Sequence, residues 1–187
     1  LIAQWQLVGF VHGVMNTDNM AVSGETIDYG PCAFLDSYHL DTVFSSIDEG
    51  GRYAYAVQPP IAQWNLARLA EAMLTLFAAD RAEAIELANA SITRFEQRFK
   101  HHFLAGMRAK LGLFTATDGD AELADALLTW MQTTRADFTN TFRLLSDASA
   151  VAAITSTDAG FLDWHRRWRE RQAREGRAAA DVIAVMR

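Results

Sequence analysis

Residues 12–31 read HGVMNTDNMAVSGETIDYGP, and this stretch decides how the rest of the chain is interpreted. Residues 19–22 have strand character, and residues 26–29 run back in the opposite direction. Between them, residues 23–25 are typical of a turn in which Gly24 is available for a positive φ. The pattern predicts a short β-hairpin whose two ends lie close together in space.

Three oxygen-bearing side chains of this stretch are candidates for a functional site. Asp18 and Asn19 lie at one end of the predicted hairpin, and Asp28 lies at the other. Oxygen ligands of this kind, few in number and without a histidine cluster, suit Mg²⁺ that is shared with substrate phosphates. We therefore expect Asn19 and Asp28 to hold a divalent cation. Because Asp and Asn also favour turns, a purely structural role is the alternative.

The segment 28–30, Asp-Tyr-Gly, resembles the DFG element of protein kinases. Counting from His12, Asn19 stands where the metal-binding asparagine of an HGD-type catalytic loop is expected. Val14 occupies the position of the catalytic aspartate, and a valine cannot accept a proton. The carboxylate is instead Asp18, and we expect it to accept the proton of an incoming hydroxyl group. His12 is expected to pack and shape the loop and not to act in catalysis.

In its particulars the chain resembles the selenoprotein O family, and the resemblance runs from Ile2 to the region of Trp164. The motifs that carry it are HGVMNTDN, TIDYGP, FLD, GRYAY, QPPIAQWNLARLAEA and RADFTNTFR. Members of this family look like kinases but bind ATP in a flipped orientation and transfer AMP to Ser, Thr or Tyr hydroxyls of proteins. The resemblance therefore implies ATP and hydroxyl-bearing proteins as partners, and Mg²⁺ or Mn²⁺ as cofactor. Asp28 is expected to bind the nucleotide through this cation.

The expected fold is mainly α with a small β-hairpin, as in the C-terminal lobe of a protein kinase, and forms a single domain over residues 1–187. Residues 1–5 already look like the middle of a helix, so we expect a fragment of a longer protein. An N-terminal lobe with a glycine-rich loop and a lysine would hold the other side of the nucleotide. The fragment alone is therefore expected to bind ATP weakly and to be nearly inactive.

Composition excludes several classes of protein. The chain has 187 residues, of which 50% are hydrophobic, so it is not disordered. Its formal net charge of −6 argues against a nucleic-acid partner. The single cysteine, Cys32, cannot form an internal disulfide, and we expect an inert buried thiol in a reducing compartment. No membrane span or secretory leader is seen, so the expected location is the cytoplasm of a bacterium, or the mitochondrion if the protein is eukaryotic.

Apart from the hairpin, hydrophobic periodicity predicts helices. A first helix leads through residues 1–11 to His12 and ends at a glycine, and residues 31–59 are expected to be irregular. The next helix starts near Pro60, and its apolar face comprises Leu66, Leu69, Ala70, Met73, Leu74 and Phe77. A capping box formed by Asp80 and Glu83 starts another helix, with a stripe of Ile85, Ile92, Phe95, Phe99 and Phe103.

Three more helices are expected towards the end of the chain. One begins near Asp120, a second carries Phe138, Phe142 and Leu145, and a third is capped by Thr157 or Asp158 and bears Phe161, Trp164 and Trp168. Six arginines between residues 166 and 177 are expected to form a solvated face, because Glu170 and Glu175 interrupt them at ion-pair spacing.

Two other functions are consistent with these residues. A conventional phosphotransferase would use the same metal pair. A degenerate kinase-like domain that acts as a scaffold is indicated by Val14 at the usual position of the base.

Overall fold

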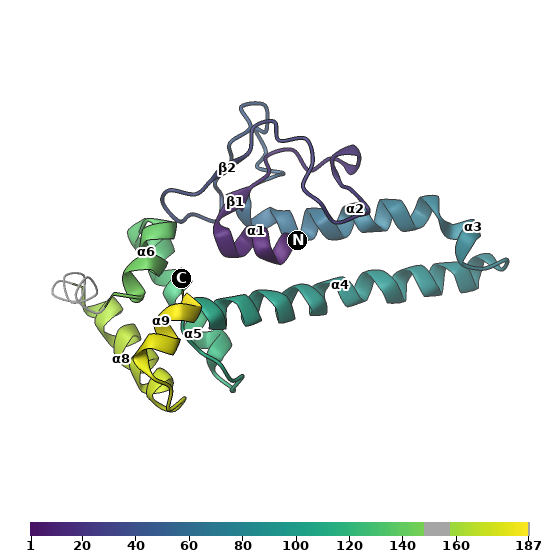
Figure 1. The fold of residues 1–187 in the computed structure, drawn as a ribbon. Helices are drawn as coiled ribbons and strands as arrows, with labels where there is room; N and C mark the ends of the chain where they lie inside the picture. Colours follow the sequence, from purple (N-terminus) through teal and green to yellow (C-terminus); the bar gives the residue numbers. More distant parts are fainter. Residues whose placement is uncertain (148–157, 187) are drawn as a thin grey trace. The chain divides into compact units, whose positions relative to one another are not determined.

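The structure is a computed structural model that describes residues 1–147 and 158–186 (Figure 1). It is mainly helical, with one two-stranded antiparallel sheet, so the predicted secondary-structure class is confirmed. The elements are α1 (Ile2–Val8), β1 (Phe10–Val11), the 3₁₀ helix η1 (Thr17–Asn19), β2 (Ala33–Phe34), the 3₁₀ helix η2 (Tyr55–Val57), α2 (Gln58–Ala72), α3 (Leu74–Phe77), α4 (Arg81–Lys110), α5 (Asp120–Thr134), α6 (Phe138–Leu145), α8 (Ala159–Ala173) and α9 (Ala179–Met186).

Contacts divide the chain into two compact units. Unit 1 comprises residues 1–34 and 40–103, and unit 2 comprises residues 35–39 and the described residues from 104 onwards. The long helix α4 contributes residues to both units. A single domain over residues 1–187 stays a prediction. Within the described residues, no helix has both the length and the apolar character needed to cross a membrane.

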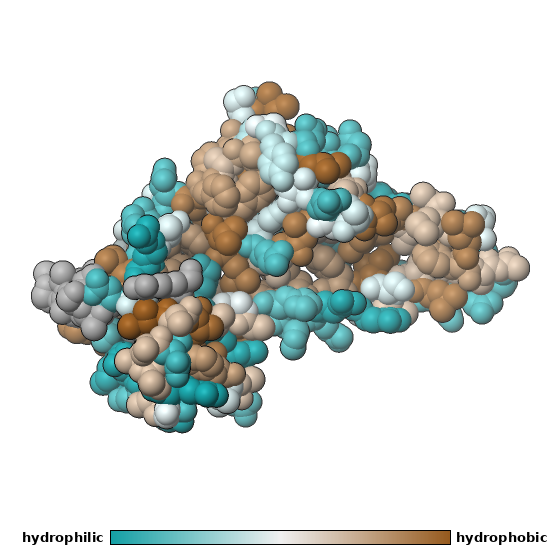
Figure 2. All heavy atoms as spheres, in the orientation of Figure 1, coloured by the Kyte–Doolittle hydropathy of each residue, from teal (hydrophilic) through white to brown (hydrophobic). Residues whose placement is uncertain are grey.

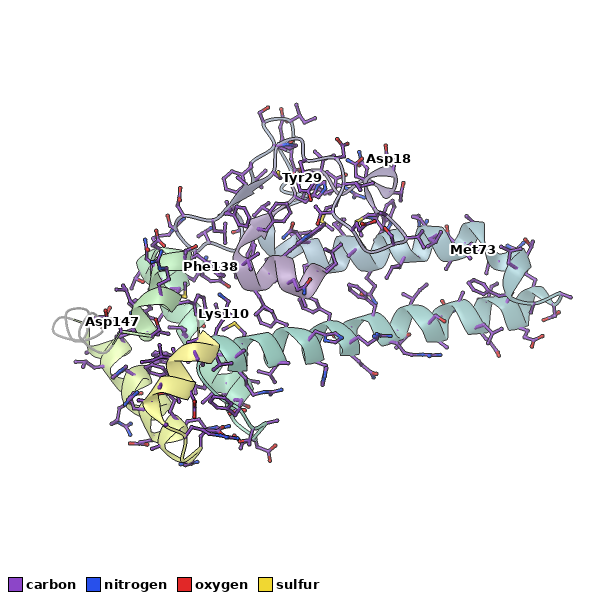
Figure 3. The ribbon with its side chains drawn as sticks, in the orientation of Figure 1. Asp18, Tyr29, Met73, Lys110, Phe138 and Asp147 are labelled. Carbon is purple, nitrogen blue, oxygen red and sulfur yellow. The ribbon has the colours of Figure 1, made fainter. Side chains whose placement is uncertain are left out.

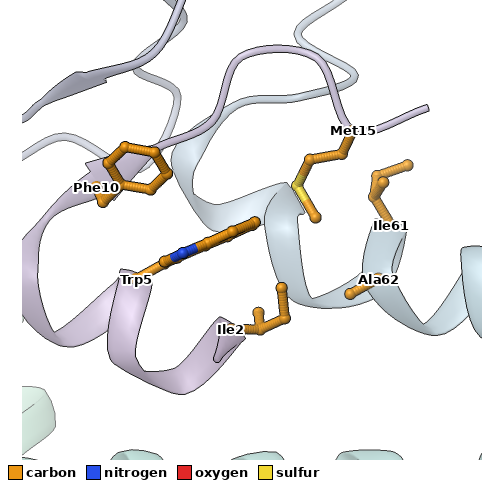
Figure 4. Packing of buried hydrophobic residues seen from close by; sticks show 6 residues of the cluster. All are labelled: Ile2, Trp5, Phe10, Met15, Ile61 and Ala62. Atoms are coloured by element: carbon orange, nitrogen blue, oxygen red, sulfur yellow. The ribbon is translucent and has the colours of Figure 1, made fainter. Parts of the chain in front are cut away.

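The core of unit 1 forms around the first helix. Figure 4 shows the buried cluster, which comprises Ile2, Trp5, Phe10, Met15, Ile61 and Ala62. Burying a large apolar side chain contributes about 1.5–3 kcal/mol to the free energy of folding. The first helix ends earlier than expected, because Gly9 adopts a left-handed conformation with φ 70°. The chain then enters β1, whose Phe10 pairs with Phe34 of β2.

The helix expected from Pro60 to Phe77 is divided in two. It begins at Gln58, with both prolines in its first turn, and α2 stops at Ala72 before the short α3. Its buried side carries Ile61, Ala62, Asn65 and Ala70. The expected apolar face is therefore partly wrong, because Leu66 and Leu69 are 38% and 39% exposed. Figure 2 shows hydrophobic side chains at the surface over α2 and α3.

Helix α4 begins as predicted. The carboxylate of Asp80 accepts a hydrogen bond from the backbone N–H of Glu83 at 2.9 Å, as in a capping box. Of the predicted stripe, Phe95 and Phe99 pack against the core of unit 1, whereas Ile85 is 39% exposed. Only the part of the stripe around Phe95 and Phe99 is therefore shown to pack on the core of unit 1.

Unit 2 is built on α5, α6, α8 and the end of α4. Phe161, Trp164 and Trp168 of α8 are each 1% exposed, and the predicted face of this helix is confirmed. Asp158 caps α8 by accepting from Gly160 and Phe161, while the other candidate cap, Thr157, lies outside the described residues. The short helix α9, which periodicity did not predict, follows α8.

The arginines of α8 do not all face solvent. Arg166 pairs with Asp163 and Glu170 on an exposed face, as predicted. Arg171 is buried instead, and its guanidinium contacts Asp120 and Glu175 at 2.8 Å each. The expectation of a solvated face is therefore wrong for Arg171, because a distant acid on α5 supplies a buried partner for its charge.

Candidate functional site

Residues 12–31 form a compact loop in unit 1. The turn is present, with Gly24 at φ 76°, but the two predicted strands are not formed. A single antiparallel bridge joins Met20 to Thr26, and residues 17–19 form the 3₁₀ helix η1. An isolated two-stranded hairpin is only marginally stable, and Asp and Asn favour tight turns over strands. The bridge still places the segments that carry Asn19 and Asp28 next to each other.

The returning arm of the loop is attached to the core by two side chains. The indole Nε1 of Trp5 donates to Oγ1 of Thr26 at 3.0 Å, and Nε2 of His12 donates to the carbonyl of Ile27 at 2.8 Å. Donation from Nε2 leaves Nδ1 of His12 as the acceptor for the backbone N–H of Val14, at 3.4 Å. His12 is completely buried, so its expected structural role is confirmed.

Gly13 brings the beginning and the end of the loop together. Its φ is 86°, and a Cβ at this position would lie 2.8 Å from Cγ of Pro31 and 3.1 Å from the Pro31 carbonyl oxygen. Only glycine combines this backbone conformation with so close an approach. Cys32, next to Pro31, is a free thiol that is partly buried against the core of unit 1.

The three predicted site residues lie on this loop. Asp18 and Asp28 are exposed, and Asn19 is half-buried. The amide nitrogen of Asn19 donates to the carbonyl of Val14 at 3.1 Å, which leaves Oδ1 as the acceptor end of the amide. Figure 3 shows Asp18 and Tyr29 in the same loop region of unit 1. The catalytic and metal-binding roles of these side chains stay predictions.

The backbone at Asp28 is unusual. Asp28 has φ 54°, one of two residues other than glycine with a positive φ among those described. Its carbonyl accepts a hydrogen bond from the N–H of Gly30 at 2.8 Å, which closes a tight turn at the Asp-Tyr-Gly element. Such a conformation is sparsely populated, and Asp tolerates it better than most residues. The turn exposes the Asp28 carboxylate.

The donor set suits a hard cation that is not held by protein alone. Among the described residues, no group of three or more His, Cys, Asp and Glu side chains is placed to hold a metal ion. A site made of Asn19, Asp28 and substrate phosphates needs only two protein ligands. Mg²⁺ is commonly held in this way, by one or two protein oxygens together with phosphates.

Helix α2 adds a residue that sequence reasoning missed. Asn65 is 5% exposed, and its Nδ2 donates to the carbonyl of Met15 at 2.9 Å. Its Oδ1 is buried without a hydrogen-bond partner among the described residues. The sequence does contain a signal for Asn65, because it follows Ile61 by four positions and therefore lies on the same, buried side of α2.

A cavity of about 340 Å³ lies beside the loop. Its walls come from the loop and from α2, and are formed by Thr17, Met20, Ala21, Val22, Asn65, Leu66, Arg68, Leu69 and Ala72. Asp18 and Asn19 do not line the cavity, but Thr17, which precedes them in the chain, and Met20, which follows them, do. The cavity therefore adjoins the pair of predicted site residues.

Known proteins resemble this chain over its whole length. The family model for the protein adenylyltransferase SelO matches residues 1–177. The chain is 52% identical over 187 residues to the protein nucleotidyltransferase YdiU of Shouchella clausii and 54% identical over 187 residues to that of Halalkalibacterium halodurans. It is 54% identical over 197 residues to the YdiU protein of Rhizobium etli.

Each of these matches covers 100% of the chain but only 38%, 38% and 39% of the respective relatives. The chain thus spans less than two fifths of the length of the curated relatives that it matches. Because the family model covers nearly all of its residues, the chain belongs to the SelO family.

Proposed function

We propose that this chain carries the catalytic loop of a protein adenylyltransferase, which transfers AMP from ATP to Ser, Thr or Tyr hydroxyls of proteins. The description of the matching family model and the names of the relatives support this reaction. We further propose that the helical units correspond to the C-terminal lobe of a kinase-like fold. Sequence motifs support this last point, because the DYG and HGVMNTDN elements resemble kinase catalytic elements.

The roles follow from the chemistry of the side chains. Asn19 and Asp28 would hold Mg²⁺, which would neutralise charge on the phosphates of the nucleotide. Asp18 would accept the proton of the acceptor hydroxyl while the hydroxyl oxygen bonds to the α-phosphorus and pyrophosphate departs. The exposure of Asp18 supports this role, since an acceptor from solution has access to its carboxylate.

The observation that carries the proposal is the way in which Asp28 is presented. The two residues before it are fixed by Trp5 and His12, and Asp28 itself turns outward in a left-handed conformation. Backbone conformations of this kind persist where the surroundings over-determine them, and they cluster at functional sites. A loop that had only to connect two elements would not need these anchors.

Labelling with ATP that is radioactive at the α-phosphate tests the proposal, in a polypeptide of full family length that contains this chain. Asp28→Gly should abolish labelling of protein acceptors, since glycine keeps the positive φ and removes only the carboxylate. Asp18→Asn should lower labelling by about 10²–10⁴-fold, the usual contribution of a positioned base. Asp118→Asn, the same change at an exposed site in unit 2, is the matched control. Unchanged labelling by Asp28→Gly would refute the proposed role.

Val14 favours a second candidate, a scaffold without catalysis. Its backbone N–H contacts His12 and its carbonyl contacts Asn19, so the position serves to shape the loop, and its side chain cannot take a proton. A ligand that binds the native state raises the melting temperature. A melting temperature that does not respond to ATP and Mg²⁺ in the full-length polypeptide would favour the scaffold.

The position of the radioactive phosphate in ATP distinguishes a conventional phosphotransferase from an adenylyltransferase. Transfer from α-labelled ATP, with an acceptor that gains the mass of AMP, supports adenylyl transfer. Transfer from γ-labelled ATP alone, with the mass of a phosphate, would identify a kinase.

A further inference from the structure

We propose that Arg52 of unit 1 binds an acidic residue of the acceptor polypeptide, a few positions along the acceptor from the hydroxyl residue that is modified. This inference rests on the proposed function and adds to it a determinant of substrate choice. It is carried by a guanidinium without a carboxylate partner, by the aromatic rings that hold this guanidinium, and by hydrogen bonds between these rings and the loop of residues 12–31.

The side chain of Arg52 is exposed and lies over two aromatic rings. Its Cζ is 5.0 Å from the centroid of the Trp64 ring and 5.7 Å from the centroid of the Tyr53 ring. Trp64 is 42% exposed, so the contact is at the surface of unit 1. Such cation–π contacts restrain a long side chain that would otherwise lose much rotamer freedom on binding a ligand. The rings therefore hold the guanidinium in place before a partner arrives.

The charge of Arg52 has no partner within the part of the chain that the structure describes. There its guanidinium takes part in no ion pair and no hydrogen bond. Asp48 is close to it in the sequence, but its two oxygens accept from successive backbone N–H groups at 2.8 Å each. Arg68, whose Cζ is 5.2 Å from the centroid of the same Trp64 ring, pairs with Glu71 at 2.6 Å. Of the two arginines on this ring, Arg52 is the one whose donors are open to a carboxylate from outside.

Hydrogen bonds connect this arginine and its rings to the proposed base. The hydroxyl of Tyr53 donates to Oδ1 of Asn16, the residue that precedes η1. The carbonyl of Asn16 accepts from the backbone N–H of Asn19 at 3.0 Å, and Asp18 lies in the same turn. One side chain and one turn thus separate Arg52 from Asp18. Extended residues cover about 3.3 Å each, so a few residues of an acceptor would span this separation.

The chemistry of the site favours a carboxylate on the acceptor. The planar guanidinium presents a fork of N–H donors that matches the two oxygens of Asp or Glu. The chain as a whole has a formal net charge of −6, so its overall field does not attract an acidic polypeptide. A preference for an acidic acceptor would therefore depend on a local cation such as Arg52. Charge pairs of this kind contribute to specificity and fix the register of a bound chain.

A first experiment measures substrate choice in a polypeptide of full family length that contains this chain. Serine peptides carry a single glutamate at successive positions on either side of the serine, and matched peptides carry glutamine there. At one or two neighbouring positions, glutamate should raise kcat/KM about fivefold, the upper range for an exposed ion pair. The preference should shrink at high salt, which screens exposed charges. Equal kcat/KM for every pair of peptides would overturn the inference.

A second experiment tests whether Arg52 itself makes the contact. Arg52→Gln should reduce the ratio of kcat/KM between the glutamate and glutamine peptides to about one. Arg52→Glu should reverse the preference, so that lysine is favoured at the same position of the peptide, a gain that a misfolded protein cannot give. Arg94→Gln, the same substitution at an exposed position of α4 in unit 1, is the matched control and should keep the preference for glutamate.

The KM for ATP shows whether Arg52 serves the nucleotide instead. If Arg52→Gln raises this KM and leaves the preference for glutamate as it was, the guanidinium binds a phosphate of the nucleotide and the inference is overturned. A preference that Arg52→Glu fails to reverse would also overturn it, because another residue would then make the contact.

Isothermal titration with the favoured glutamate peptide separates this inference from the proposed function, because it measures binding without transfer. If the unmodified protein transfers no AMP to any acceptor, the proposed function fails, while binding that Arg52→Gln weakens would still show a carboxylate site at Arg52. If AMP is transferred and Arg52→Gln binds the peptide like the unmodified protein, only the inference about Arg52 fails.

Discussion

Arg171 of α8 donates from Nε to Oδ1 of Asp120, the first residue of α5, at 2.8 Å. The two side chains are 10% and 1% exposed, so this is a buried ion pair that joins two helices distant in the sequence. Burial alone would raise the pKa of Asp120, but hydrogen bonds from Arg171 and Thr117 and the charge of Arg171 lower it below its usual value. The pair therefore contributes to the stability of unit 2 only while Asp120 is ionised.

Removing one member of the pair should destabilise unit 2 strongly. We expect Arg171→Leu to lower the free energy of unfolding by about 3–5 kcal/mol, since the buried carboxylates of Asp120 and Glu175 both lose the guanidinium that they share. The double change Asp120→Leu with Arg171→Leu should cost less than the single change, because one buried carboxylate, that of Glu175, is then left without its guanidinium partner instead of two. Urea titrations of the three proteins measure this. Equal losses in the single and double variants would contradict it, and Arg166→Leu on the exposed face is the control.

The same pair predicts how stability depends on acid. The pKa of Asp120 is lower in the folded state than the value of about 3.9 in an unfolded chain, so the unfolded state binds protons first as the pH falls. The stabilisation is complete above about pH 4 and is lost as the pH falls through the folded-state pKa. Denaturant titrations at several pH values should show a shallower acid loss for Asp120→Asn than for the unmodified chain. Parallel curves would contradict this assignment.

The burial of Lys110, the last residue of α4, predicts that the stability of the protein changes at alkaline pH. Burial lowers its pKa to about 8, whereas the lysines of an unfolded chain titrate near 10.4. Its Nζ lies 4.1 Å from the centroid of the Phe142 ring, and this cation–π contact opposes the shift. Between the two pKa values the unfolded chain keeps the proton, so stability should rise as the pH increases from about 8 to 10.

NMR of the lysine side chains measures this directly, because the sequence contains only two lysines. Lys110 should titrate near pH 8, with the exposed Lys100 as internal reference. Lys110→Met should abolish the rise in stability, and Lys100→Met should leave it. A Lys110 that titrates together with Lys100 would mean that the aromatic contacts outweigh burial.

The anchor between Trp5 and Thr26 links the core of unit 1 to the proposed cation site. Thr26→Val keeps the shape of the side chain but removes the acceptor of the Trp5 indole N–H, which should cost about 1–3 kcal/mol of stability. It should also weaken Mn²⁺ binding, followed by electron paramagnetic resonance, because the segment that carries Asp28 loses one attachment. Thr139→Val, at an exposed position of α6, is the matched control. A destabilised Thr26→Val with unchanged cation binding would show that the anchor serves the fold alone.

The isolated chain should bind the nucleotide poorly. It offers only the proposed metal-ligand side of a nucleotide site, and it spans 38% of the length of relatives such as that of Halalkalibacterium halodurans. Isothermal titration of the 187-residue chain with Mg²⁺ and ATP should show little heat of binding. A submicromolar dissociation constant would contradict this expectation.

Helices were predictable from the sequence because their signals are local. Asp80 and Asp158 act as caps, α5 begins at Asp120 as expected, and α6 buries the predicted Phe138, Phe142 and Leu145. The strands β1 and β2 were missed, because two residues show no period and their pairing depends on contacts across more than twenty positions. The loop was expected as a hairpin, and only its turn and one bridge are present.

The sequence motifs nominate residues for the candidate site, whose catalytic and metal-binding roles stay predictions, but they do not predict its geometry. Asp18, Asn19 and Asp28 were recognised by their motifs. The positive φ of Asp28 and the buried Oδ1 of Asn65 depend on tertiary contacts that no local pattern reports. The burial of Arg171 was missed for the same reason, since its partner Asp120 lies 51 positions away.

The missing side chain at Gly13 has a consequence for the energetics of cation capture. Because Pro31 packs against the backbone of Gly13, the two ends of the loop that carries the proposed metal ligands are held together in the folded protein. Closing the loop in this way removes conformational freedom in advance. A cation would then bind side chains that are already ordered, and its affinity would carry a smaller entropic cost. Gly13→Ala would force the two ends of the loop apart, so that this entropic cost would again lower the affinity for the cation.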